Sequence, residues 1–126
     1  MPYDNPPQLP VGDIDILIDV QSAISHRNTW VQNRFRDGNR KCLVAALSLA
    51  CGSPAFSQPN PTERRLARVL AKELPSNAPL GTRLRLIPAR QRLMWFNDHN
   101  RTAHADVLAL LDRAINHMAS KMPAYA

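Results

Sequence analysis

The feature that most constrains this chain is a polar turn followed by a long amphipathic run near the C-terminal end. The turn covers residues 96–102 and the run covers residues 103–118. Within the run, apolar residues recur every three or four positions: Val107, Leu110, Leu111, Ala114, Ile115 and Met118. This spacing predicts a helix with one broad apolar face.

The polar residues of the turn are expected to have structural roles. Asn97 and Asp98 are predicted to accept hydrogen bonds from nearby backbone amides and so to fix the angle between two helices. Asp98 is also placed to pair with Arg101. Thr102 is predicted to cap the last helix, because a hydroxyl before an apolar run is a common N-cap.

Four further segments carry helix signals: 12–25, 40–50, 61–74 and 88–96. Gly52 is well placed to end the second of them. Asn60 predicts the start of the third, with proline at the first helical position and Glu63 reaching back to the backbone amide of Asn60. Residues 30–35 and 82–87 alternate loosely, so that each is open to a short extended conformation or to a loop.

These elements predict a single compact all-α domain of four to five helices, with room for one short extended segment. The helices that contain Cys42 and Val107 are expected at its centre. The predicted organisation is a proline-rich N-terminal lead over 1–11, one helical domain over 12–121 and a frayed tail over 122–126.

Composition narrows the functional classes. The chain has 126 residues, of which 44% are hydrophobic and 21% charged, as in an ordinary globular domain. No apolar run approaches the roughly 18 residues that a membrane-spanning helix needs, and no signal peptide pattern is present. Cys42 and Cys51 stand nine positions apart in one predicted helix, where they cannot form a disulfide. We therefore expect a cytoplasmic protein without a membrane partner.

Charge is unevenly distributed along the chain. Residues 1–20 contain four aspartates and no Lys or Arg, whereas residues 27–92 contain 13 Lys or Arg against three acidic residues. A positive surface attracts phosphate-rich partners, although a solvated arginine surface can also serve solubility alone. The candidate binding residues are Arg64, Arg65, Arg68, Lys72, Arg90 and Arg92, with Trp95 as a stacking face. The last helix is too apolar to read a DNA groove.

An alternative is a small cysteine-dependent enzyme. Cys42 lies near a predicted helix start, where the helix dipole lowers a thiol pKa, and His104 or His99 would be its base. Asn97 or Asp98 would orient that base. Against this, Cys42 shares the apolar stripe of its helix, and a buried cysteine behaves as a small hydrophobe. Asp98, His99, His104 and Asp106 lack the spacing of a metal site, so neither a metal nor a cofactor is predicted.

The sequence resembles an uncharacterised family of small proteins from bacteria and their phages. The resemblance rests on Trp30, on the Cys-Leu-x-x-Ala-Leu run over 42–47 and on the Phe-Asn-Asp turn over 96–98. It implies a shared fold and no activity. We therefore expect a small basic non-enzymatic binding or accessory protein whose partner is another protein or a nucleic acid, with the Cys42 enzyme as the alternative. No oligomeric state is predicted.

Overall fold

The computed structural model describes residues 9–121. Within this range the chain forms five α-helices, two short 3-10 helices and one antiparallel hairpin. Its elements are α1 (Leu9–Ala23), η1 (Arg27–Thr29), β1 (Arg36–Asp37), β2 (Arg40–Lys41), α2 (Leu43–Cys51), α3 (Pro61–Ala71), η2 (Leu80–Arg83), α4 (Ala89–Asp98) and α5 (His104–Ser120). The predicted fold class, a compact all-α domain of four to five helices, is confirmed. Every helix in the described range is too short or too polar to cross a membrane.

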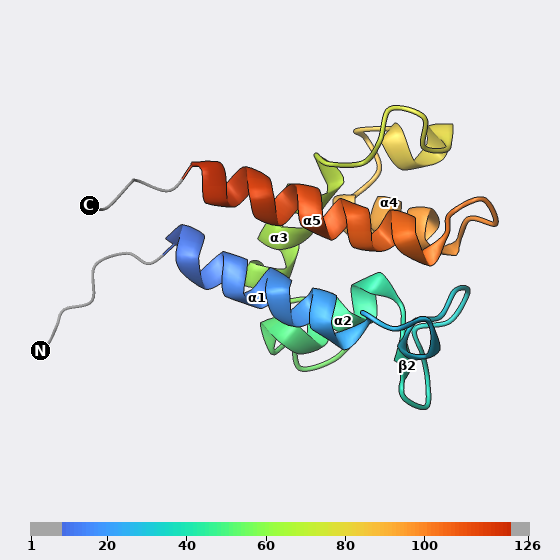
Figure 1. The fold of residues 1–126 in the computed structure, drawn as a ribbon, viewed down its shortest axis with the longest axis horizontal. Coiled ribbons are helices and arrows are strands. Elements are labelled where there is room, and N and C mark those ends of the chain that lie inside the picture. Colours follow the sequence, from blue (N-terminus) through green and yellow to red (C-terminus); the bar gives the residue numbers. More distant parts are fainter. Residues whose placement is uncertain (1–8, 122–126) are drawn as a thin grey trace, which may run out of the picture.

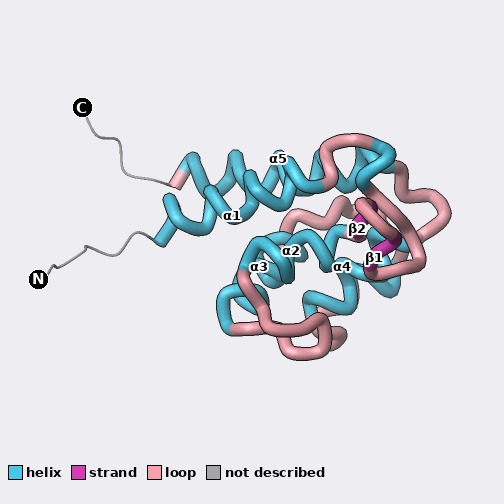
Figure 2. Tube along the Cα trace, turned by 90° about the horizontal axis from the view of Figure 1, so that it is seen from below, coloured by secondary structure: helices cyan, strands magenta, loops and turns pink. Residues whose placement is uncertain are grey.

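The helices form two groups. The first helix, α1, and the last, α5, lie side by side and run in opposite directions, so that α1 starts where α5 ends (Figure 1). Figure 2 shows α2, α3 and α4 gathered on one side of this pair, with the hairpin at the far end. The turn between α4 and α5 lies at that same end, and it thereby connects the two groups.

The core is built around α2. Six consecutive residues of this helix, 43–48, are buried, which a helix allows only when neighbours cover all of its sides. From α5, Val107, Leu110, Leu111 and Ala114 are fully buried, as the helical spacing predicts. The free energy gained from these apolar contacts, about 25 cal/mol per Å² of buried surface, holds the two helix groups together.

Several predicted boundaries shift in the structure. Helix α1 begins at Leu9, within the segment predicted as an N-terminal lead, and residues 1–8 and 122–126 lie outside the described residues. Helix α2 begins at Leu43 because Arg40 and Lys41 pair with β1 instead. Gly52 ends α2 in the left-handed conformation, with φ of 73°, as predicted.

One predicted N-cap is wrong, and a second predicted cap lacks one of its two hydrogen bonds. The N-cap of α5 is Ala103, not Thr102, and its backbone N–H donates to the Asp106 carboxylate over 2.8 Å. At the start of α3, Asn60 does cap the helix by accepting from the Glu63 N–H at 2.8 Å. The Asn60 N–H, however, donates to the Ser53 hydroxyl rather than to Glu63.

Neither segment with loose alternation forms a strand. In 30–35, Trp30 makes an isolated bridge to Lys41 and the following residues bend. In 82–87, η2 ends at Arg83 and a turn follows. The one extended element of the described residues is the short hairpin around Gly38.

Candidate functional site

Asn97 is the centre of a buried polar cluster. Its side chain is fully buried, and its amide oxygen accepts from the Trp30 indole N–H at 2.7 Å and from the Leu43 N–H at 3.2 Å. Its amide nitrogen donates to the Val31 carbonyl at 3.1 Å and to Asp98 at 2.9 Å. Four hydrogen bonds use the full capacity of the amide, and one of them satisfies the first N–H of α2. The Asn97 side chain therefore connects α4 to the start of α2 and to the segment around Trp30.

The rest of the α4–α5 turn is held in the same way. The Gln32 amide nitrogen lies 2.9 Å from the carbonyl oxygens of both Asn97 and His99 and 3.2 Å from that of Thr102. The Asp98 carboxylate accepts from the N–H of Asn33, which has a left-handed backbone with φ of 64°. Among the ion pairs of the described residues, Asp98 has none with Arg101, so that predicted pair is not formed.

The cysteine and histidines of the enzymatic alternative have other partners. Cys42 is the N-cap of α2, only 4% exposed, and its sulfur accepts from the Ala45 N–H at 3.3 Å. His104 lies against Trp30, with 5.2 Å between ring centroids, and its Nε2 is 2.6 Å from the Ile24 carbonyl oxygen. The Nδ1 of His99 accepts from the Arg101 N–H at 3.1 Å. Burial raises the pKa of the Cys42 thiol, which is opposite to the shift that a nucleophile needs.

Both thiols are accordingly expected to resist alkylation in the folded protein. Burial, followed by the charge of Glu63, raises the pKa of Cys51 to about 11. At pH 7.5, iodoacetamide should label both cysteines at least about tenfold more slowly in the native protein than in denaturant, because the thiolate fraction falls. Mass spectrometry of timed samples measures this ratio. Equal rates at Cys42 would instead favour the enzymatic alternative.

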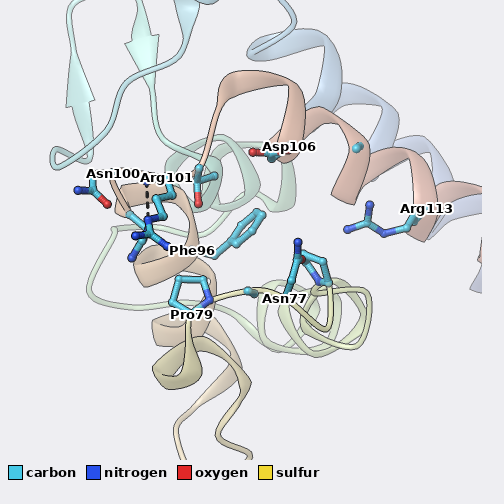
Figure 3. A pocket seen from close by; sticks show the side chains of 12 residues that line it. Asn77, Pro79, Phe96, Asn100, Arg101, Asp106 and Arg113 are labelled. Carbon is cyan, nitrogen blue, oxygen red and sulfur yellow. Dashed lines mark hydrogen bonds between the residues drawn. The ribbon is translucent and has the colours of Figure 1, made fainter.

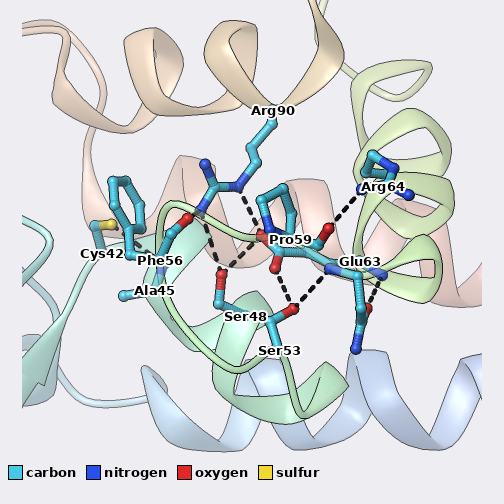
Figure 4. Close-up of polar contacts among 10 residues, drawn as sticks. Cys42, Ala45, Ser48, Ser53, Phe56, Pro59, Glu63, Arg64 and Arg90 are labelled. Atoms are coloured by element: carbon cyan, nitrogen blue, oxygen red, sulfur yellow. Dashed lines mark hydrogen bonds and ion pairs between the residues drawn. The ribbon is translucent and has the colours of Figure 1, made fainter.

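A second buried polar cluster surrounds Glu63, at the start of α3 (Figure 4). The carboxylate is fully buried and accepts from Ser48 at 2.7 Å, from Ser53 at 2.6 Å and from the Arg90 Nε at 2.6 Å. Arg90 also donates to the Phe56 carbonyl and lies over the Phe56 ring, 4.3 Å from its centroid. This network connects α2, α3 and α4. Sequence reasoning missed it, because nothing local marks Glu63 as buried.

Arg90 also borders an open pocket of about 560 Å³ between α3 and the start of α4, which we call the arginine groove. Five arginines line it: Arg64, Arg68, Arg85, Arg90 and Arg92. The other lining residues are mainly apolar: Pro59, Ala67, Leu86, Ile87, Pro88, Ala89, Gln91 and Met94. No acidic residue is among them, so the groove combines concentrated positive charge with aliphatic surface.

The arginines of the groove differ in how they are satisfied. Arg90 is neutralised by Glu63, whereas Arg64, Arg68, Arg85 and Arg92 form no ion pair with any described residue. The Nε of Arg92 is buried and has no hydrogen-bond partner in the described part of the chain. A buried donor without an acceptor is costly. The exposed arginines Arg64, Arg68 and Arg85 are the cations that an anion in the groove can reach.

The structure thus brings together four of the seven predicted binding residues: Arg64, Arg68, Arg90 and Arg92. Arg65 points elsewhere and pairs with Asp13 at 2.6 Å. Lys72 and Trp95 are exposed outside the groove lining. Arg85 is an additional member of the groove, and the sequence already places it with Arg83, Arg90 and Arg92 among the basic residues open to a nucleic-acid role.

A second pocket, of about 730 Å³, lies beside the α4–α5 turn (Figure 3). Arg101 and Asn100 border it on one side, Arg113 on the other, and Phe96 lies between them. Asp106 also lines it, and Arg113 already donates to the Glu73 carbonyl at 2.8 Å. Its polar groups are therefore partly engaged and of mixed charge. Among the described residues, no three His, Cys, Asp or Glu side chains are placed to bind a metal.

Comparison with known proteins gives a family but no activity. The family model described as "Family of unknown function (DUF6197)" matches residues 9–117. Searches of curated proteins and of solved structures returned no match.

Proposed function

Since the chain belongs to DUF6197, a family of unknown function, we propose its role from its own surface: a small non-enzymatic binding protein that holds an anionic partner in the arginine groove. The observation that carries this proposal is the set of four arginines without ion pairs around one pocket, with the unpartnered Nε of Arg92 among them. Charge-assisted hydrogen bonds from arginine to carboxylate or phosphate are among the strongest polar contacts in proteins.

Within the groove, only Arg90 is neutralised by a carboxylate of the described chain, and Arg64 donates to the Pro59 carbonyl. Outside the groove, Arg40 and Arg65 each pair with an aspartate. Like charges repel one another, so a cluster of unneutralised arginines costs stability unless a ligand or solvent screens it. The chain carries a net charge of +6, and the groove concentrates part of it in one place.

A non-enzymatic role is proposed because the candidate nucleophile does not face either pocket. Cys42 is buried as a helix cap and lines neither the arginine groove nor the pocket beside the α4–α5 turn. The side chains that line the groove are mainly cationic and aliphatic, and these groups bind and orient a partner but do not transfer protons at neutral pH. The cytoplasmic location and the bacterial or phage origin expected from the sequence stay predictions.

Charge-matched variants test the proposal. The triple variant R64Q/R68Q/R85Q removes three exposed arginines from the groove, and R27Q/R34Q/R101Q removes three exposed arginines from elsewhere. At about 50 mM salt, the groove variant should bind poly-glutamate and a thymidine oligonucleotide at least about tenfold more weakly than the wild type, and its affinity should depend less on salt. Fluorescence anisotropy measures both quantities.

The control variant has the same net charge and should keep most of the affinity. Equal losses in the two triple variants would show a diffuse charge effect and would contradict a specific groove. Failure of the wild type to bind either polyanion at about 50 mM salt would contradict the proposed function as a whole.

A further inference from the structure

We infer that the occupant of the arginine groove is an acidic peptide segment with aliphatic side chains, presented by a partner protein. This inference rests on the proposed function and narrows it, because the groove offers apolar surface directly beside its cations.

The apolar side of the groove is unusually exposed. Leu86 is 99% exposed, although it lies in a described turn rather than at a chain end. Ile87 and Met94, which line the same pocket, are partly buried and continue this surface toward α4. An exposed aliphatic side chain next to a pocket is typical of an interaction surface, since burying it against a partner is favourable.

The lack of aromatic residues in the described groove lining argues against a nucleic acid as the occupant. Proteins that bind single strands stack bases on aromatic side chains, and no aromatic residue is among those that line the groove. Trp95 is 42% exposed but lies outside the lining. Phe56 packs against Phe35, with 3.7 Å between ring centroids, and covers Arg90. The groove thus provides cations and aliphatic contacts without a stacking surface.

The start of α4 adds donors suited to a carboxylate. Pro88 is the N-cap of this ten-residue helix and provides no side-chain hydrogen bond. The first helical N–H groups, at Ala89, Arg90 and Gln91, belong to residues that line the groove, and the positive end of the helix dipole lies there. Together with the exposed Arg64, Arg68 and Arg85, they favour carboxylates of a peptide whose aliphatic side chains contact Leu86.

Three probes of equal charge separate the possibilities. They are a ten-residue peptide in which acidic residues alternate with leucine, the same peptide with serine in place of leucine, and a thymidine oligonucleotide. Wild-type protein should bind the leucine peptide at least about tenfold more tightly than the serine peptide, as expected from partial burial of the leucines. Leu86→Ser should reduce this preference about fivefold.

The matched control is Leu49→Ser, because Leu49 is 51% exposed on α2 and lies outside the groove lining. It should leave the preference unchanged, whereas Arg85→Gln should weaken binding of both peptides alike. Equal affinity for the two peptides, or tighter binding of the oligonucleotide than of the leucine peptide, would overturn the inference while leaving anion binding in place. If no probe binds, it is the proposed function that fails.

Discussion

Asn97→Ala is expected to destabilise the domain by about 3 to 5 kcal/mol. The substitution removes the partner of the Trp30 indole, of the Leu43 N–H and of the Val31 carbonyl, all of which belong to segments distant from Asn97 in sequence. Each buried group left without a partner costs about 1 to 3 kcal/mol. Since whole domains are stable by only about 5 to 15 kcal/mol, urea unfolding should show a large fall in the midpoint.

Asn100→Ala is the matched control, because Asn100 is exposed in the same turn and its side chain forms no hydrogen bond with the described residues. Its effect should stay within about 0.5 kcal/mol. Asn97→Asp keeps the acceptor but loses both donated hydrogen bonds and adds a charge beside Asp98, so it should also be strongly destabilising. A loss below about 1 kcal/mol in Asn97→Ala would contradict the central role of this cluster.

The same cluster shows how far the sequence could predict the fold. Periodicity predicts the last helix, and the structure confirms it as α5. Asn97 and Asp98 lie just before it and make hydrogen bonds to distant segments. Their partners Trp30 and Asn33 lie about 65 residues earlier, on a segment without regular structure. No local pattern specifies such long-range hydrogen bonds, because they depend on how the helix groups pack.

The arginine groove was predictable in part from spacing. Arg64 and Arg68 are four residues apart and share one face of α3, whereas Arg65 lies about 100° around the helix and reaches Asp13 instead. The separation of Arg65 from Arg64 and Arg68 therefore follows from helix geometry alone. The position of Arg85 in the groove does not follow from any local pattern, because it depends on the path of the turn after η2.

Glu63 shows why a correct local pattern can still mislead. Its position three residues after Asn60 fits a capping box, and Asn60 does cap α3. The carboxylate turns inward, however, because Ser48, Ser53 and Arg90 together offer it more hydrogen bonds than one backbone amide can. Tertiary contacts have outweighed the local preference, and the Glu63 carboxylate is the most buried charge of the described chain.

Glu63→Ala should therefore be as damaging as Asn97→Ala, with an expected loss of about 3 to 5 kcal/mol in the free energy of unfolding. It leaves Arg90, whose side chain is 19% exposed, without its carboxylate, and it leaves the Ser48 hydroxyl without an acceptor. Removing one partner of a buried ion pair has a far larger effect than removing an exposed one. Urea unfolding followed by circular dichroism measures the difference.

The matched control is Asp13→Ala, which breaks the more exposed ion pair with Arg65 and should cost at most about 1 kcal/mol. The double variant Glu63→Leu with Arg90→Met removes both charges, so that no buried charge is left unpaired. Its loss in the free energy of unfolding should be smaller than the sum of the losses measured for Glu63→Leu and Arg90→Met alone. Additive losses would mean that Glu63 and Arg90 stabilise the domain independently. In that case the pair would not connect α3 to α4, and the position of the arginine groove would have to depend on apolar packing alone.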